Sequence, residues 1–174
     1  MDNQNNAAHS TANIYNPLIE AAKPVFILVN AMQQTTSQLS TDSLINKFSL
    51  LINNFEENAE KNGARYDAIQ AAKYCLCTFV DELAVRAGWA DETWSKNSLL
   101  VSFYDETWGG ERFFEIIQNL KQDPDKNIDL LEFMYLCLQF GYKGKYQVLN
   151  SGELEIDKIK RDLLALIHSK RPDQ

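Results

Sequence analysis

The chain has 174 residues, a net charge of -7 and an apolar fraction of 45%, which is the size and composition of one soluble domain. Its 7 Gly and 4 Pro provide little for a loop-rich β architecture, and its acidic balance argues against a nucleic-acid partner. The most apolar stretch, residues 24–32, is about half as long as a bilayer span. The polar start of the chain does not resemble a signal peptide. We therefore expect an all-α cytoplasmic domain.

Helical periodicity and helix-end signals recur along the chain from residue 16 onward. Residues 1–15 show no periodicity and are predicted to be a disordered tail, whereas 16–174 should form the helical domain. The first helix should open at Asn16-Pro17, where an N-cap residue precedes a proline, and end near residue 35. Six more helices are expected over residues 40–62, 64–87, 98–106, 113–120, 128–140 and 156–171. This makes about seven helices and no convincing strand.

The expected helix at 64–87 is apolar on two faces. One broad stripe contains Ile69, Ala72, Leu76, Phe79, Val80, Leu83 and Ala87. A second patch, with Tyr74, Cys77 and Val85, lies on the far side. A helix with two apolar faces should lie in the middle of a bundle or between two lobes.

The same helix carries two carboxylates, Asp81 and Glu82, in otherwise apolar surroundings. Adjacent helical residues point about 100° apart, so this pair cannot act on one substrate atom as an acid–base couple. Arg86 follows Glu82 at the spacing of a surface ion pair. Asp81 has no such neighbour, so it should bind a group from another segment or line a cleft. A structural role and a docking role both remain open for it.

Metal and nucleophile signals are weak. Cys75 and Cys77 point to nearly opposite sides of a helix, and together with Cys137 they are predicted to be free core thiols. The two histidines, His9 and His168, complete neither a metal site nor a Cys–His pair. We therefore predict no catalytic, metal or cofactor site.

Glycines and aromatic residues gather between the predicted helices of the second half. Gly109-Gly110 lacks the pattern of a phosphate-binding loop and precedes Glu111, so a tight turn is expected there. The nearby aromatic residues could form core or a partner surface, and both readings stay open. They are Trp89, Trp94, Phe103, Tyr104 and Trp108.

Four segments, read in order, carry a family resemblance. They are NPLIEAAKPVF (16–26), YCLCTFVDELA (74–84), the stretch 94–120 with SLLVSFYDETWGGERFFEIIQNL, and DLLEFMYLCLQFGYKGKYQVL (129–149). In this order they resemble the DotU family, also called IcmH or TssL, whose members are inner-membrane components of bacterial type VI and type IVB secretion systems. The resemblance covers nearly all of the chain from residue 16 to about residue 170.

The resemblance implies a cytoplasmic domain of two packed three-helix bundles shaped like a hook. In the family a C-terminal transmembrane helix follows, and we expect that this chain lacks it. The implied function is a non-enzymatic scaffold at the cytoplasmic face of the inner membrane. Its implied partners are an IcmF/TssM-type membrane protein and, in a type VI system, baseplate components, with a homodimer as a further candidate. Type VI and type IVB both remain open, and the alternative is a soluble helical adaptor or ligand-binding bundle unrelated to secretion.

The resemblance also assigns residues. The family's acidic pair, at the cleft between the bundles, corresponds to Asp81 and Glu82. We expect this pair either to dock a partner segment or to pin the two bundles together. Two glycine-aromatic motifs also match, and we assign them mainly to architecture. They are the turn Trp108, Gly109 and Gly110, and the loop with Gly141, Tyr142, Gly144 and Tyr146.

Overall fold

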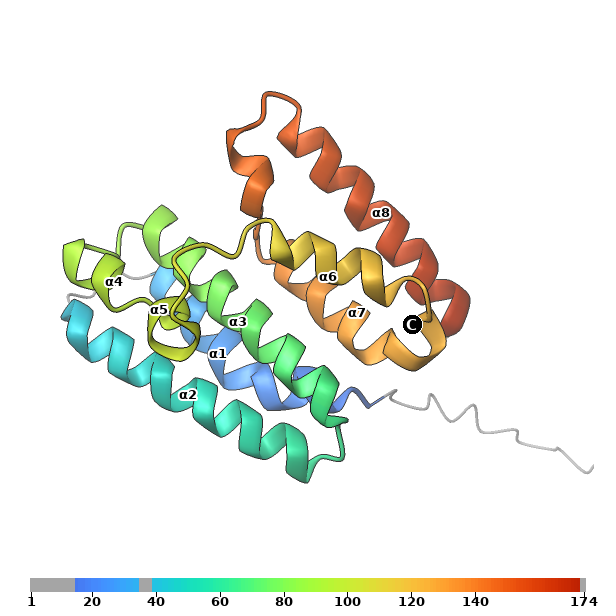
Figure 1. The fold of residues 1–174 in the computed structure, drawn as a ribbon, viewed down its shortest axis with the longest axis horizontal. Helices are drawn as coiled ribbons and strands as arrows, with labels where there is room; N and C mark the ends of the chain where they lie inside the picture. Colours follow the sequence, from blue (N-terminus) through green and yellow to red (C-terminus); the bar gives the residue numbers. More distant parts are fainter. Residues whose placement is uncertain (1–14, 35–38, 173–174) are drawn as a thin grey trace, which may run out of the picture.

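The computed structural model describes residues 15–34 and 39–172, and in these ranges it contains helices and loops but no strand (Figure 1). The helices are α1 (Pro17–Gln34), α2 (Thr41–Lys61), α3 (Tyr66–Arg86), α4 (Glu92–Lys96), α5 (Leu99–Tyr104), α6 (Arg112–Leu120), α7 (Pro124–Gln139), the 3-10 helix η1 (Gly144–Val148) and α8 (Gly152–Lys170).

The predicted all-α class is confirmed. The seven predicted helices correspond to α1, α2, α3, α5, α6, α7 and α8, and the prediction missed the short α4 and η1. The predicted disordered tail lies outside the described residues except for Tyr15, and so does the predicted end of the first helix near residue 35.

Side-chain caps begin α1, at the expected position, and α7, which starts at Pro124 and so four residues before the expected residue 128. The Asn16 side-chain oxygen accepts hydrogen bonds from the backbone N–H groups of Leu18 at 3.0 Å and Ile19 at 3.2 Å. Asp123 caps α7 in the same way, accepting from the N–H of Lys126 at 3.3 Å. In both helices a proline follows directly, where its missing N–H costs no helical hydrogen bond.

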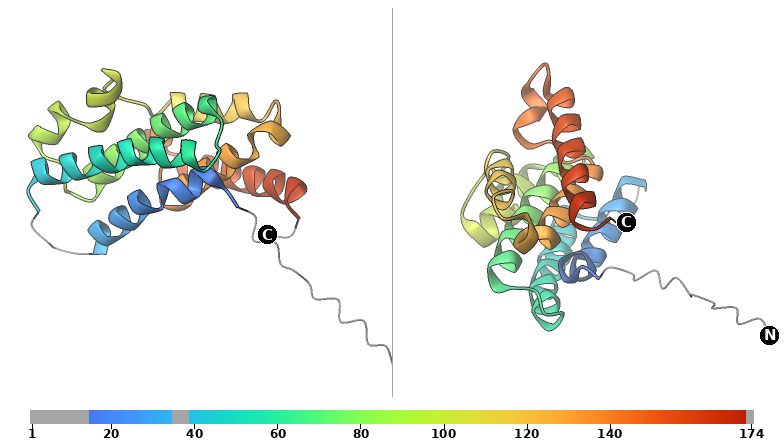
Figure 2. Two further views of the ribbon diagram at one scale, coloured as in Figure 1. Left: turned by 90° about the horizontal axis from the view of Figure 1, so that it is seen from below. Right: turned by 90° about the vertical axis from the view of Figure 1, so that its right-hand side faces the viewer.

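The helices form two groups (Figure 1). In the first, α1, α2 and α3 pack together with α4 and α5 at one end, while α6, α7 and α8 form the second. In the right-hand view of Figure 2, α8 and the segment leading to it project from the rest, which gives the molecule a hook-like outline. Helix α3 lies between the groups and packs on α1, α2, α5, α6 and α7. This position explains why α3 is apolar on two faces.

A cluster of phenylalanines joins the two groups in one core. Phe26 of α1 lies 5.3 Å from Phe79 of α3 and 6.0 Å from Phe133 of α7, measured between ring centroids. Phe55 of α2 lies 6.2 Å from Phe133. Each buried ring contributes about 1.5–3 kcal/mol through burial, and each ring pair adds about 0.5–1.5 kcal/mol. The bundles therefore share one hydrophobic core.

The three cysteines are free and fully buried, as predicted. Burial raises the pKa of the Cys75, Cys77 and Cys137 thiols above the ordinary value. Because the thiolate is the reactive form, these side chains act as small apolar core residues. No described helix is both long enough and apolar enough to cross a bilayer.

A polar cluster ties the start of α1 to the end of α8. The Asn16 amide donates to the carbonyl of Asp129 at 2.9 Å and to the carboxylate of Glu132 at 3.2 Å. Arg171 forms ion pairs with both Asp129 and Glu132. The side chains of Arg171 and Glu132 are only 14% and 9% exposed, so this is a nearly buried charge cluster.

Replacing Arg171 by Ala should lower the free energy of unfolding by about 2 kcal/mol or more, because it removes the cation from a nearly buried carboxylate. Lys170→Ala is the matched control, since its ion pair with Asp125 is more exposed and should contribute less than about 1 kcal/mol. Urea unfolding followed by circular dichroism measures both. Equal losses in the two variants would contradict the prediction.

Candidate functional site

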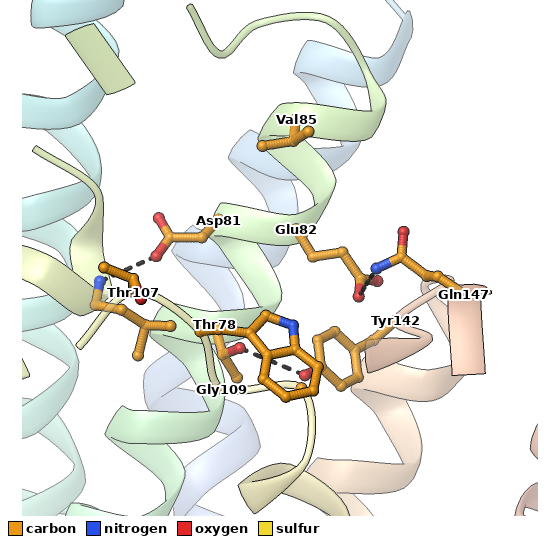
Figure 3. A pocket seen from close by; sticks show the side chains of 11 residues that line it. Thr78, Asp81, Glu82, Val85, Thr107, Gly109, Tyr142 and Gln147 are labelled. Carbon is orange, nitrogen blue, oxygen red and sulfur yellow. Dashed lines mark hydrogen bonds between the residues drawn. The ribbon is translucent and has the colours of Figure 1, made fainter. Parts of the chain in front are cut away.

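A cleft of about 200 Å³ lies over one face of α3 (Figure 3). Its floor consists of Thr78, Asp81, Glu82 and Val85. One wall is the connector, which we define as residues 105–111 between α5 and α6. The other wall is the loop, defined as residues 140–151 between α7 and α8. The cleft therefore lies where the two helix groups meet over α3.

Asp81 holds the start of α5. One carboxylate oxygen accepts hydrogen bonds from the Trp94 indole N–H at 3.1 Å and from the backbone N–H of Leu99 at 2.9 Å. The other oxygen accepts from the backbone N–H of Leu100 at 2.9 Å. The first N–H groups of a helix have no partner within that helix, so Asp81 supplies an acceptor that α5 lacks. Asp81 thus binds groups from another segment and also lines the cleft.

Glu82 holds the loop. Its carboxylate accepts hydrogen bonds from the backbone N–H groups of Lys143 at 2.8 Å and Gly144 at 2.7 Å, and from the Gln147 amide at 2.7 Å. The ion pair with Arg86 is present at 3.6 Å, but the Glu82 side chain is only 9% exposed. The predicted ion pair is therefore present, but Glu82 is not at the surface and its main partners are in the loop. Helical spacing identifies neighbours on the same helix and gives no information about contacts with a distant loop.

The two carboxylates point to different sides of α3 (Figure 3). Burial raises the pKa of both Asp81 and Glu82 above the ordinary values, and the hydrogen bonds from backbone N–H groups oppose that rise. Because each carboxylate binds a different segment, they do not converge on one position as a catalytic pair would. Within the part of the chain that the structure describes, no group of three or more His, Cys, Asp or Glu residues could hold a metal ion.

The Trp108-Gly109-Gly110 turn allows the connector to approach α3 closely. A Cβ on Gly109 would lie 2.7 Å from the Thr78 hydroxyl oxygen, and one on Gly110 would lie 2.7 Å from the Trp108 ring. Both glycines are buried, whereas the Trp108 side chain is 58% exposed. The glycines thus shape the wall of the cleft, and Trp108 presents its indole to the outside.

The loop contains two glycines in left-handed conformations. Gly141, with φ 105°, ends α7, and the backbone N–H of Tyr142 returns to the carbonyl of Cys137 at 3.1 Å. Gly144 has φ 52°, and a Cβ there would lie 2.7 Å from the carbonyl oxygen of Gly110. A side chain at position 144 would therefore push the loop away from the connector.

The two tyrosines of the loop pack it against α6. The Tyr142 ring is buried 4.2 Å from the Phe113 ring, and the Tyr146 ring lies 4.8 Å from Phe114. The Tyr142 hydroxyl lies 3.4 Å from that of Thr78 on the cleft floor (Figure 3). Both tyrosines thus contribute to architecture.

Sequence reasoning missed a second connection between the connector and α3. The Tyr74 hydroxyl donates to Glu106 at 2.7 Å, and Arg112 donates to the other oxygen of that carboxylate at 3.1 Å. The Arg112 guanidinium also lies 4.4 Å from the centre of the Tyr74 ring. This network was not visible in the spacing of the residues. The contact between Asp81 and α5, by contrast, had a signal in the sequence. The first N–H groups of any helix need an acceptor from outside that helix, and Asp81 on the preceding long helix was a carboxylate without a partner.

Fold and cleft together define an all-helical domain of two groups that meet over α3. The model of the family described as type VI secretion system protein DotU matches residues 17–174, so the chain belongs to the DotU family. The resemblance found in the sequence is confirmed. No curated protein sequence matches the chain.

Solved structures are similar over most of the chain. TssL from Vibrio cholerae is 33% identical, with a TM-score of 0.80 over 90% of this chain and 99% of that one. The cytoplasmic domain of TssL from Acinetobacter baumannii is 25% identical, with a TM-score of 0.76 over 86% and 98%. SciP/TssL from enteroaggregative Escherichia coli 042, at 18% identity and a TM-score of 0.71 over 87% and 88%, supports the fold alone. The all-helical TssL-like fold is thus shared.

Two conservative variants should loosen different segments. Asp81→Asn and Glu82→Gln each place an NH2 group where a backbone N–H now donates, and each should cost about 1–3 kcal/mol. Hydrogen exchange followed by NMR should show faster exchange at Leu99 and Leu100 in the first variant, and at Lys143 and Gly144 in the second. Each variant is the control for the other, and identical exchange patterns would contradict the assignment.

The raised pKa values predict a pH dependence. An acid whose pKa is higher in the folded state stabilises the fold fully below its unfolded pKa, about 4, and loses that contribution as pH rises through the folded pKa. The stability advantage of the wild type over Asp81→Asn or Glu82→Gln should therefore shrink as pH rises from about 4 towards neutrality. Urea unfolding across this range measures it. An advantage that grows with pH would show that the hydrogen bonds outweigh burial.

Proposed function

We propose that this chain is the cytoplasmic domain of a TssL-type inner-membrane component and acts as a non-enzymatic scaffold. Its proposed partners are an IcmF/TssM-type membrane protein and cytoplasmic baseplate components of a type VI system. Membership of the DotU family carries this proposal, together with the fold shared with Vibrio cholerae TssL. The likeness to the cytoplasmic domain of Acinetobacter baumannii TssL supports placing the chain at the cytoplasmic face of the membrane.

The cleft over α3 is our proposed docking site for one of these partners. Trp108 and Val85 line it with side chains that are 58% and 64% exposed, and exposed aromatic residues beside a pocket are common interface contacts. Asp81 and Glu82 already bind donors of this chain, so we assign them to holding the cleft in shape and keeping its floor negative. The sequence left open whether Asp81 and Glu82 dock a partner or pin the two bundles together. In this proposal they support docking by pinning the segments that form the cleft.

A ligand-binding bundle is less well supported. Pockets for small molecules usually enclose about 300–1,000 Å³, whereas this cleft has about 200 Å³. A protruding side chain of a partner protein fits such a volume better. The remaining alternative is a soluble adaptor, and cell fractionation of the native protein distinguishes it from the membrane-associated scaffold. A purely cytosolic protein would contradict the scaffold proposal.

Trp108→Ala should weaken partner binding without weakening the fold. As a central contact of the proposed docking site, the exposed indole should contribute at least about a tenfold change in affinity, while the free energy of unfolding should change by less than about 0.5 kcal/mol. Pull-down titrations with the purified IcmF/TssM-type and baseplate proteins of the same bacterium measure the affinity.

Tyr66→Ala is the control, because Tyr66 is 76% exposed and is not among the residues lining the cleft. It should leave both affinity and stability unchanged. If Trp108→Ala binds every one of these partners as the wild type does, the cleft is not the docking site. If no member of the set binds the wild type, the scaffold proposal itself fails.

A further inference from the structure

A second recess of about 300 Å³ lies between α7 and α8 and shares no lining residue with the cleft. We call it the α7–α8 groove. It is lined by Tyr135 and Gln139 of α7 and by Asp157, Lys160, Arg161 and Leu164 of α8. We propose that the α7–α8 groove binds an acidic segment of a partner protein, independently of the docking cleft.

The cations of the groove have no anionic partner in the described part of the chain. Lys160 and Arg161 form no ion pair there, whereas Lys170 at the end of α8 and Arg171 directly after it both do. Asp157 lies three and four residues before the two cations, a spacing that permits pairing, yet it lies beyond ion-pair distance of both. In a chain of net charge -7, two adjacent unpaired cations beside one carboxylate leave the groove with a local positive charge.

The rest of the lining suits carboxylates carried on an apolar segment. Leu164 and Tyr135 are half-buried and provide apolar surface. The Gln139 amide donates to the Tyr135 hydroxyl oxygen, which leaves the hydroxyl hydrogen available for an incoming carboxylate. Arg161 can bind a carboxylate through two parallel N–H groups, and Lys160 adds a point charge. The groove therefore combines donors and apolar contact within one recess.

An acidic protein segment fits the groove better than an anionic membrane does. A lipid surface is flat and binds clustered basic residues, whereas these cations line a recess that also contains Asp157. The exposed residues of α8 also mix charges, with Asp162 beside Arg161. A peptide can place its carboxylates beside Lys160 and Arg161 and keep them away from Asp157.

The test uses the purified chain and a fluorescein-labelled peptide of alternating Glu and Leu residues, followed by fluorescence anisotropy at physiological ionic strength. The wild type should bind it saturably and more tightly than a peptide of alternating Gln and Leu. Lys160→Ala with Arg161→Ala should weaken binding about fivefold or more. Lys47→Ala with Lys61→Ala is the control, because it removes the same charge from two exposed residues of α2 and should change binding less than twofold.

Three results would overturn the proposal. Equal weakening in the two double variants would indicate non-specific attraction, and equal binding of the two peptides would remove the role of the carboxylates. Binding to phosphatidylglycerol vesicles that depends on Lys160 and Arg161, without binding to the Glu-Leu peptide, would assign the groove to the membrane. Circular dichroism checks that both double variants remain folded.

Discussion

Two adjacent carboxylates on one helix must each satisfy backbone N–H groups of a different segment, and the cleft depends on this constraint. Neighbouring helical side chains diverge by about 100°, so Asp81 reaches the start of α5 while Glu82 reaches the loop. Burying a carboxylate is unfavourable unless such hydrogen bonds offset the lost hydration. The pair therefore joins segments far apart in the sequence, and each segment in turn stabilises the charge that holds it.

Close backbone contacts, in addition to the two carboxylates, hold the walls of the cleft in place. Gly109 lets the connector lie against Thr78 of α3, and Gly144 lets the loop lie against the carbonyl of Gly110. The same carbonyl accepts a hydrogen bond from the backbone N–H of Lys145 at 3.1 Å. Connector and loop thus touch backbone to backbone above α3. The connector and the loop, which are the two walls of the cleft, therefore form one connected unit, and the exposed Trp108 is part of it.

Much of the fold could be predicted from the sequence, because periodicity and caps are local. Asn16, Asp123 and Gly141 mark helix ends by their own chemistry, and the structure has helix ends at all three. The five-residue helices α4 and η1 were missed because so short a segment has no measurable period. The site was harder to predict. The local sequence shows that a carboxylate in apolar surroundings needs a hydrogen-bond partner, but it does not show which distant residue provides one. Asp81 was expected to find one elsewhere, whereas Glu82 seemed satisfied by Arg86 and in fact holds the loop.

The charge cluster around Glu132 has a consequence for the path of the chain. Asn16 and Arg171 both bind Glu132, so the backbone enters and leaves the described domain at one corner. Chain ends that lie together can be joined by a short linker without distorting the core. The order of the helices along the chain could then be permuted, with new ends in the exposed stretch at residues 149–151, which follows η1, while the packing of α3 against both bundles stays the same.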